Sequence, residues 1–247
     1  MTYCLAIQVD AGIVFAADTR TSAGVDYVTT YSKLHCFSTD GDNGLALLSA
    51  GSLATTQEVV SWIRRDLEQN NAENLNSFSR MFELAGYVGR VSQAVQATHR
   101  AGLQASNVSG QASFILGGQV RGEPPGIYLV YAEGNFIRAS TDTPYLQIGE
   151  TKYGKPILDR LVAPTLNLAQ ATRLAVLSLN ATIKSNVTVG TPIDLGLYRS
   201  DSFRAPERSR LDGDDAYYTA VNDGWNEGLK EVFMRLPEFE WRDTARR

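Results

Sequence analysis

Apolar and polar side chains alternate strictly over residues 2–9. The odd-numbered residues from Tyr3 to Val9 share one apolar face, and smaller or polar residues occupy the other. A repeat of two residues is typical of a half-buried β-strand. An Asp-Ala-Gly turn follows at residues 10–12, and β-branched and aromatic residues resume at 13–17. The pattern predicts an antiparallel hairpin with a three-residue loop.

The register of this hairpin decides which side chains lie near the start of the chain. If Val9 faces Ile13, then Cys4 faces Asp18 on the same face as Thr2. Asp18 is then a diagonal neighbour of Thr2, at roughly 5 to 8 Å between side-chain bases. A slip of one residue would turn Asp18 to the opposite face. The plainer interpretation of Asp18 is a carboxylate that ends a strand and begins a turn.

The rest of the chain predicts strands and helices in alternating groups. Strands are expected at 32–38, 44–49, 112–119, 126–132, 136–140, 144–148 and 192–199, and helices at 52–69, 78–105, 152–161, 168–184 and 215–236. Short strands separated by glycine and proline turns favour antiparallel pairing. This order predicts an α+β fold in which two stacked antiparallel sheets carry helix pairs outside, a four-layer αββα sandwich. We expect residues 1–247 to form one domain, with a helical C-terminal extension from about 215.

Composition favours an ordinary soluble globular protein. The 247 residues are 43% hydrophobic and 20% charged, with a net charge of −4 and scattered Lys and Arg. This balance makes nucleic acid and anionic membranes poor partners. No stretch approaches the about 20 apolar residues of a membrane span, and the start of the chain has no signal-peptide pattern. We therefore expect a cytoplasmic protein.

Few residues are available for metal, redox or nucleotide chemistry. The two cysteines, Cys4 and Cys36, are too few for a disulfide framework, and only His35 and His99 could help them to bind zinc. No glycine-rich loop ends in Lys-Ser or Lys-Thr, so ATP hydrolysis is not expected. Two histidines without a motif context give little support to a Ser-His-Asp arrangement. The sequence predicts no metal site and no cofactor.

Thr2 is a candidate nucleophile because of its position. A threonine hydroxyl reacts poorly until a base takes its proton, and a chain-terminal threonine carries an α-amine with a pKa near ~8. That amine exists only if Met1 is removed, and methionine excision tolerates a small second residue. The plainer interpretation is that Thr2 is simply a common second residue.

Lys33 is the second candidate for a catalytic role. The expected strand at 32–38 would place Lys33, His35 and Phe37 on one face. A cation near the terminal threonine, balanced by Asp18, would depress the pKa of the amine through like-charge repulsion. The plainer interpretation of Lys33 is a solvated charge at the edge of a strand.

These residues together carry a resemblance to a known family. Thr2, the run 12–20, the run 32–34 and the turn 49–52 resemble the proteasome β-type N-terminal nucleophile peptidases. Within that superfamily the chain is most similar to the bacterial proteasome homologues called Anbu, the ancestral β-subunit group. The resemblance covers most of the chain and is clearest over its first sixty residues.

The resemblance implies a fold, an activity and an assembly. The fold is the αββα sandwich of N-terminal nucleophile hydrolases. The activity is that of a threonine peptidase acting on peptides or unfolded proteins, in which Thr2 attacks and Asp18 and Lys33 assist. The N–H of Gly51 would stabilise the oxyanion, although a glycine between a strand and a helix is usually just a turn. The assembly is a homo-oligomeric ring or stack.

Three departures from the proteasome β-subunit pattern stand out. The interval from Thr2 to Lys33 is one residue shorter. Residues 149–151, which include Glu150, stand where those subunits place a serine near the nucleophile. Asn186 and Val189 occupy the places of a supporting Asp and Ser. Losing that carboxylate would hold the terminal amine less firmly, which predicts weak activity or a different substrate class.

Two alternative functions remain open. One is a catalytically silent N-terminal nucleophile fold that serves as a scaffold subunit of a ring, for which retained Met1 would speak. The other is an amidase of the same superfamily that acts on a small molecule. Under any of these functions, the exposed segments 201–215 and 237–247 are candidates for contacts between subunits.

Overall fold

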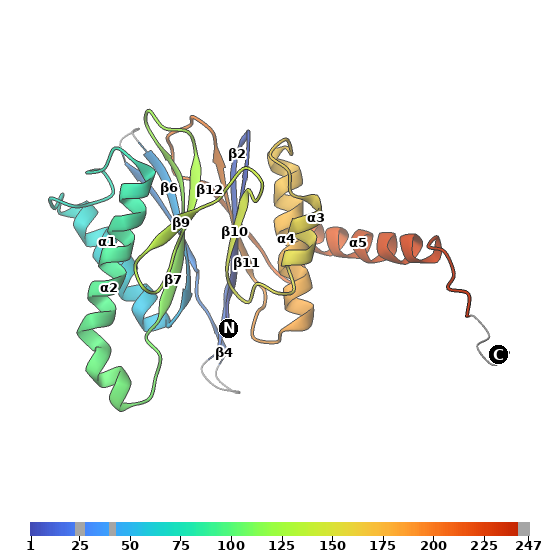
Figure 1. Cartoon of the computed structure of the whole chain (residues 1–247), viewed down its shortest axis with the longest axis horizontal. Helices are drawn as coiled ribbons and strands as arrows, with labels where there is room; N and C mark the ends of the chain where they lie inside the picture. The colour runs from blue at the N-terminus through green and yellow to red at the C-terminus, as the bar shows by residue number, and fades with distance from the viewer. Residues whose placement is uncertain (23–27, 40–42, 242–247) are drawn as a thin grey trace, which may run out of the picture.

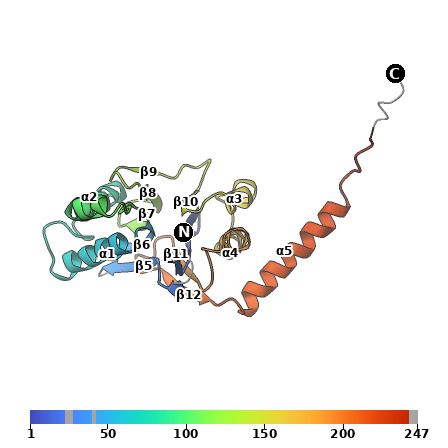
Figure 2. The ribbon, with the colours of Figure 1, turned by 90° about the horizontal axis from the view of Figure 1, so that it is seen from below.

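The computed structural model describes residues 1–22, 28–39 and 43–241. Two five-stranded sheets lie face to face in the middle of the molecule (Figure 1). Helices α1 (Leu53–Glu68) and α2 (Met81–Ala105) cover one sheet, and helices α3 (Lys155–Leu161) and α4 (Leu168–Ser185) cover the other (Figure 2). The predicted α+β fold, a four-layer αββα sandwich of two antiparallel sheets, is confirmed.

Each sheet pairs its neighbouring strands antiparallel. The first sheet has the order β10 (Tyr145–Gly149), β1 (Tyr3–Val9), β2 (Gly12–Asp18), β11 (Ile193–Arg199) and β12 (Glu207–Leu211). The second has the order β5 (Leu34–Thr39), β6 (Asn43–Gly51), β7 (Ala112–Val120), β8 (Gly126–Val130) and β9 (Phe136–Arg138). The first sheet thus joins strands from both ends of the chain.

Three apolar layers hold the sandwich together. One lies between the sheets, and the other two lie between each sheet and its helices. In β1, Tyr3 and Leu5 pack toward α3 and α4, whereas Cys4 and Ala6 pack toward the second sheet. The prediction of a half-buried strand was therefore wrong, because both faces of β1 are buried. The inner face carries small side chains such as Cys4 and Ala6, which the sequence pattern assigned to the exposed face, yet they fit the narrow space between two stacked sheets.

The hairpin register differs from the prediction by one residue. Val9 faces Gly12, and Cys4 faces Ala17, so the loop has two residues and Asp18 lies level with Tyr3. β11 approaches Gly12 so closely that a Cβ at this position would lie 2.0 Å from the carbonyl oxygen of Tyr198. The absent side chain of Gly12 lets it pair with β11 as the first residue of β2. The close approach of β11 therefore sets where the turn ends.

Three short strands carry too little apolar pattern to be predicted. β3 (Arg20–Ser22) and β4 (Val28–Thr30) form a small two-stranded sheet of their own. β12 is an edge strand in which only Leu211 is buried. An edge strand gains its place from backbone pairing with β11, so its side chains leave no alternating signature.

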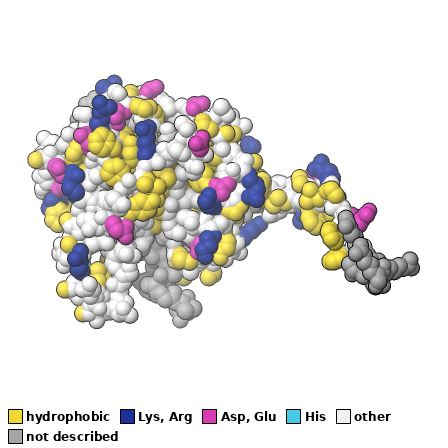
Figure 3. Space-filling view, viewed as in Figure 1, with side chains coloured by type: hydrophobic (Ala, Val, Ile, Leu, Met, Phe, Trp, Pro, Cys, Tyr) yellow, Lys and Arg dark blue, Asp and Glu magenta, His cyan; other side chains and the backbone are white. Residues whose placement is uncertain are grey.

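The last helix, α5 (Ala216–Met234), projects from the α4 side of the sandwich (Figures 1 and 2). Its first half is attached to α4, since Asn180 donates to the Tyr218 hydroxyl (3.0 Å) and Lys184 to Asn226 (3.0 Å). Apolar side chains gather on its outer part (Figure 3). Those exposed by 49% to 89% are Leu229, Val232, Phe233, Met234, Leu236, Phe239 and Trp241.

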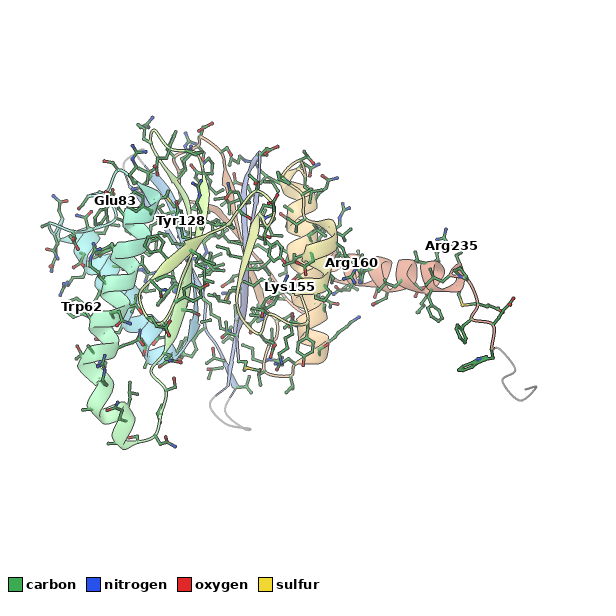
Figure 4. All side chains as sticks on the ribbon, viewed as in Figure 1. Trp62, Glu83, Tyr128, Lys155, Arg160 and Arg235 are labelled. Carbon is green, nitrogen blue, oxygen red and sulfur yellow. The ribbon has the colours of Figure 1, made fainter. Side chains whose placement is uncertain are left out.

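This outer part lies away from the rest of the molecule. Arg235, just beyond α5, is far from Lys155 and Arg160 on α3 (Figure 4). None of the helices within the described ranges is long and apolar enough to cross a membrane.

Candidate active site

Asp18, at the end of β2, is a fully buried carboxylate. Lys33 Nζ (2.6 Å) and the backbone N–H of Tyr3 (3.0 Å) donate to its Oδ1, and the N–H of Gly190 (3.3 Å) donates to its Oδ2. Burial raises the pKa of the Asp18 carboxyl, whereas the ammonium group and the two N–H donors act in the opposite direction. A cation and two peptide groups thus hold this carboxylate inside the protein.

Lys33 precedes β5 and connects the two sheets. Its Nζ also donates to the carbonyl oxygen of Arg20 (2.7 Å), and the residue is 5% exposed. The prediction that Lys33 shares a strand face with His35 and Phe37 was wrong. Because β5 begins at Leu34, Lys33 is free of strand alternation, and its side chain crosses to β2 in the other sheet.

Thr2 immediately precedes β1, and its backbone is fixed on both sides. Its carbonyl oxygen accepts from the N–H of Glu150 (2.7 Å). Gly149 permits this approach, because it has φ +85° and a Cβ there would lie 1.9 Å from the Thr2 oxygen. On the other side, the N–H of Tyr3 is bonded to Asp18. Thr2 therefore lies next to the Asp18–Lys33 pair, in spite of the shifted register.

The terminal amine lies within the field of the same charges. In this structure the amine belongs to Met1. Partial burial lowers the pKa of this amine, and repulsion by Lys33 lowers it further, whereas the carboxylates of Asp18 and Glu150 raise it. The net effect lowers the pKa of an amine at this end of β1 below its ordinary value, which favours the neutral form that a general base requires.

Gly51 ends β6 at the same edge of the sandwich. The N–H of Ser49 donates to the carbonyl oxygen of Lys33 (3.1 Å). Because N–H groups two residues apart point to the same side of a strand, the N–H of Gly51 points toward the Lys33 side. Its φ is +111°, and a Cβ would lie 2.3 Å from the carbonyl oxygen of Gln111. Glycine is therefore required at this position, next to the first turn of α1.

A second polar group lies beside Thr2. Glu150 is 5% exposed and accepts from Asn186 Nδ2 at Oε2 (3.2 Å). Asn186 Oδ1 in turn accepts from the N–H (3.0 Å) and the hydroxyl (2.6 Å) of Thr188. Val189 is fully buried in the apolar layer under α4, and its side chain contributes no polar group to the site around Thr2.

The structure brings Thr2, Asp18 and Lys33 together at one end of the two sheets, the end at which the N-terminus lies (Figure 1). Sequence reasoning missed Gly190 and Arg20 as supports of the buried ion pair. Both act through backbone groups, for which the sequence gives no signal. Among the described residues, no cluster of three or more His, Cys, Asp or Glu could hold a metal ion.

Comparison with known families identifies this arrangement. The family model described as proteasome subunit matches residues 2–197, which is most of the chain and begins at Thr2. The chain belongs to the proteasome subunit family. A search of curated protein sequences finds no significant match.

Solved structures place the chain in the Anbu group of that family. A mutant of Anbu from Hyphomicrobium sp. strain MC1 is 40% identical, with a TM-score of 0.90 over 98% of this chain and 100% of that one. Anbu from Yersinia bercovieri is 39% identical, with a TM-score of 0.91 over 97% and 100%. A helical assembly of the Anbu complex from Pseudomonas aeruginosa is 41% identical, with a TM-score of 0.91 over 99% and 100%. The resemblance inferred from the sequence is confirmed.

Membership of the proteasome subunit family explains the architecture. The αββα sandwich is the N-terminal nucleophile hydrolase fold, and the family supports a proteasome-like hydrolase.

Proposed function

We propose that this chain is a threonine peptidase in which Thr2, exposed by removal of Met1, attacks peptide bonds. The buried pair of Lys33 and Asp18, at 2.6 Å and tied to the N–H of the residue after Thr2, is the observation that carries the proposal. A buried ion pair contributes little to stability compared with apolar packing, because both charges lose their hydration. Its presence at the start of the chain is better explained by chemistry than by stability.

The proposed reaction begins with proton transfer. The α-amine of mature Thr2, directly or through a water molecule, takes the proton of the Thr2 hydroxyl. The Oγ attacks the peptide carbonyl carbon, and the N–H of Gly51 donates to the resulting oxyanion. The ammonium group then returns its proton to the leaving amine. An ester of Thr2 remains, and a water molecule activated by the amine hydrolyses it to release the acid and regenerate Thr2.

Asp18 and Lys33 support this chemistry without exchanging protons themselves. The ammonium group of Lys33 favours loss of the hydroxyl proton and disfavours a second positive charge on the amine. Asp18 neutralises Lys33 and fixes it against the backbone of Arg20 and Tyr3. This arrangement lets one buried cation act on the terminal residue without leaving a net buried charge.

The decisive test is Thr2→Ala beside the matched control Thr165→Ala, which changes an exposed threonine. Protein prepared with Thr2 as its first residue is treated with a peptide epoxyketone, an electrophile directed at terminal threonines, and analysed by mass spectrometry. We expect one adduct on the wild type and on Thr165→Ala, and none on Thr2→Ala. Equal labelling and peptide hydrolysis in all three proteins would refute the proposal.

The state of the N-terminus separates the enzyme from a silent scaffold. Mass spectrometry of protein from its native host should show loss of Met1. A chain that retains Met1 has an amide in place of the amine, and it would support the scaffold function instead. Peptide turnover that falls off when the substrate is shortened to one or two residues would distinguish a peptidase from an amidase.

We further propose that copies of the chain assemble through α5. Seven exposed apolar side chains lie at and beyond the outer part of α5, on a helix that projects from the sandwich. A contiguous exposed apolar surface of this kind is typical of a protein interface. The relative from Pseudomonas aeruginosa forms a helical assembly, which supports association between copies rather than binding of an unrelated protein.

A further inference from the structure

Glu150 is a buried carboxylate that the proposed reaction does not use. The buried charged side chains of the described residues are Asp18, Lys33, Glu150 and Asp194. Asp18 is paired with Lys33, and Asp194 with Arg210 (2.7 Å). Within the described ranges, Glu150 has no cationic side chain as a partner and accepts only from the amide of Asn186. A carboxylate removed from water in this way is costly unless a positive charge lies near.

The backbone brings Glu150 to the first residues of the chain. Glu150 follows β10, which pairs with β1 through Tyr3 and Gly149. Its N–H donates to the carbonyl oxygen of Thr2 (2.7 Å). The terminal amine of this structure, which belongs to Met1, lies within the field of the Glu150 carboxylate, and the carboxylate acts on that amine in the direction that stabilises its charged form.

Asn186 fixes the direction of the Glu150 carboxylate. As the C-cap of α4, Asn186 donates its backbone N–H to Thr182 (2.8 Å). Two donors of Thr188 engage its Oδ1, so the amide group cannot turn, and Nδ2 must point to Glu150 Oε2. The other carboxylate oxygen, Oε1, has no hydrogen bond to any described residue and remains able to accept one.

Asp18 cannot easily take this role. Its two oxygens already accept from Lys33, Tyr3 and Gly190. A further ammonium group at Asp18 would also lie beside the ammonium group of Lys33, which repels it. Two carboxylates with separate tasks resolve this conflict, one for the lysine and one for the terminal amine.

We infer that Glu150 is the positioning residue for the α-amine of mature Thr2. Asn186 holds Glu150 Oε2, and Oε1 accepts an N–H from the amine, which keeps the amine beside the Thr2 hydroxyl. This inference rests on the proposed function, because it assigns a partner to the base of that reaction. Lys33 and Glu150 act on the amine in opposite directions, since Lys33 disfavours its charged form and Glu150 favours it.

The first test measures the amine itself and requires no activity. Protein released from an N-terminal fusion so that Thr2 is its first residue is reductively methylated with ¹³C-formaldehyde, and the α-amine is titrated by NMR. We expect Glu150→Gln to lower the pKa of the α-amine, because a nearby negative charge is lost. The matched control Glu133→Gln removes the same charge from an exposed loop and should leave this pKa unchanged. Equal pKa values in both variants would overturn the inference.

The second test follows the rate of adduct formation between Thr2 and the epoxyketone against pH, a reaction in which the hydroxyl adds to the ketone and the α-amine opens the epoxide. Glu150→Gln should move the acidic limb of the rate profile to lower pH and reduce the plateau rate roughly 10- to 100-fold, since the amine loses its orientation. Glu150→Asp should recover part of the plateau, and Asn186→Ala should give a smaller loss in the same direction. A lower plateau with an unmoved acidic limb would indicate a merely structural role and would overturn the inference.

The two tests separate failure of the inference from failure of the proposed function. If the wild type forms no epoxyketone adduct at any pH, the peptidase proposal fails, whereas the amine titration still decides whether Glu150 binds the amine. If the wild type forms the adduct and Glu150→Gln behaves as Glu133→Gln does in both tests, only the role of Glu150 is refuted. Circular dichroism and thermal melting show that each variant is folded.

Discussion

Replacing Lys33 by methionine tests whether the buried ion pair is held as the structure describes. The side chain of Lys33 is 6% exposed and that of Asp18 is fully buried, with 2.6 Å between Nζ and Oδ1. Methionine has a similar length but carries no charge. Lys33→Met therefore leaves Asp18 buried with only two N–H donors, those of Tyr3 and Gly190.

The expected loss is large for a single substitution. Removing one partner of a buried ion pair costs about 3 to 5 kcal/mol of unfolding free energy, because the remaining charge is uncompensated. In urea this corresponds to a midpoint lower by roughly 1 to 2 M for a chain of this size. The exposed pair of Arg90 and Glu73, at 3.0 Å, is the control, and Arg90→Met should cost about 0 to 1 kcal/mol.

The loss of stability in Lys33→Met should depend on pH, and the shifted pKa of Asp18 gives the sign of this dependence. Burial raises the pKa of Asp18, and without Lys33 no cation opposes this rise. Above the pKa of an ordinary aspartate, the unfolded chain releases a proton that Asp18 of folded Lys33→Met still binds. The stability deficit of Lys33→Met relative to wild type therefore grows as pH rises, and it shrinks below the pKa of an ordinary aspartate.

Urea unfolding of wild type, Lys33→Met, Asp18→Asn and the double variant at several pH values measures these quantities. The double variant, which buries no charge, should recover part of the loss. A deficit below 1 kcal/mol for Lys33→Met, or one that does not change with pH, would show that the pair is not buried as described.

Three further predictions concern other parts of the chain. Burial lowers the pKa of His35 to about 4, so wild-type stability should fall as pH drops from about 6.5 toward that value, and His35→Gln should lack this component in urea unfolding. Gly51→Ala should abolish formation of the epoxyketone adduct and cost roughly 1 to 3 kcal/mol of unfolding free energy because of the positive φ at this position. Gly102→Ala is the control, because a Cβ at this position of α2 would meet no neighbour, and it should be nearly neutral or stabilising; urea unfolding with labelling checks both. Phe233→Glu together with Trp241→Glu should lower the oligomer mass in analytical ultracentrifugation without changing the thermal melting of the monomer, and an unchanged mass would exclude α5 as the contact.

The fold could be predicted from the sequence wherever side-chain pattern and structure agree. The strands and helices with long apolar repeats appear close to their predicted places, as in α4, for which Asn167 and Gln170 also form a capping box. The strands that were missed depend on backbone pairing. The hairpin register could not be predicted, because the decisive contact is between Gly12 and Tyr198, which are distant in the sequence.

In the candidate site, too, the sequence predicted some residues, whereas contacts between distant residues could not be predicted. Thr2, Asp18 and Lys33 were predicted as residue types with suitable chemistry, and the resemblance to the proteasome family joined them. The face assigned to Lys33 was wrong, because the residue precedes its strand. Glu150 and Asn186 were noted only as departures from the family pattern. Their contact depends on how the end of β10 meets the end of α4, which no local pattern encodes.

The strand order of the first sheet has a consequence for the timing of maturation. β1 needs β10, and β2 needs β11, so neither of the first two strands has its outer neighbour until residues 145–199 have left the ribosome. Pairings between such distant segments form slowly compared with local ones. The peptide between Met1 and Thr2 therefore stays accessible to an aminopeptidase during most of translation. If Thr2 is the nucleophile proposed above, the same late closure keeps its site from being assembled on a nascent chain.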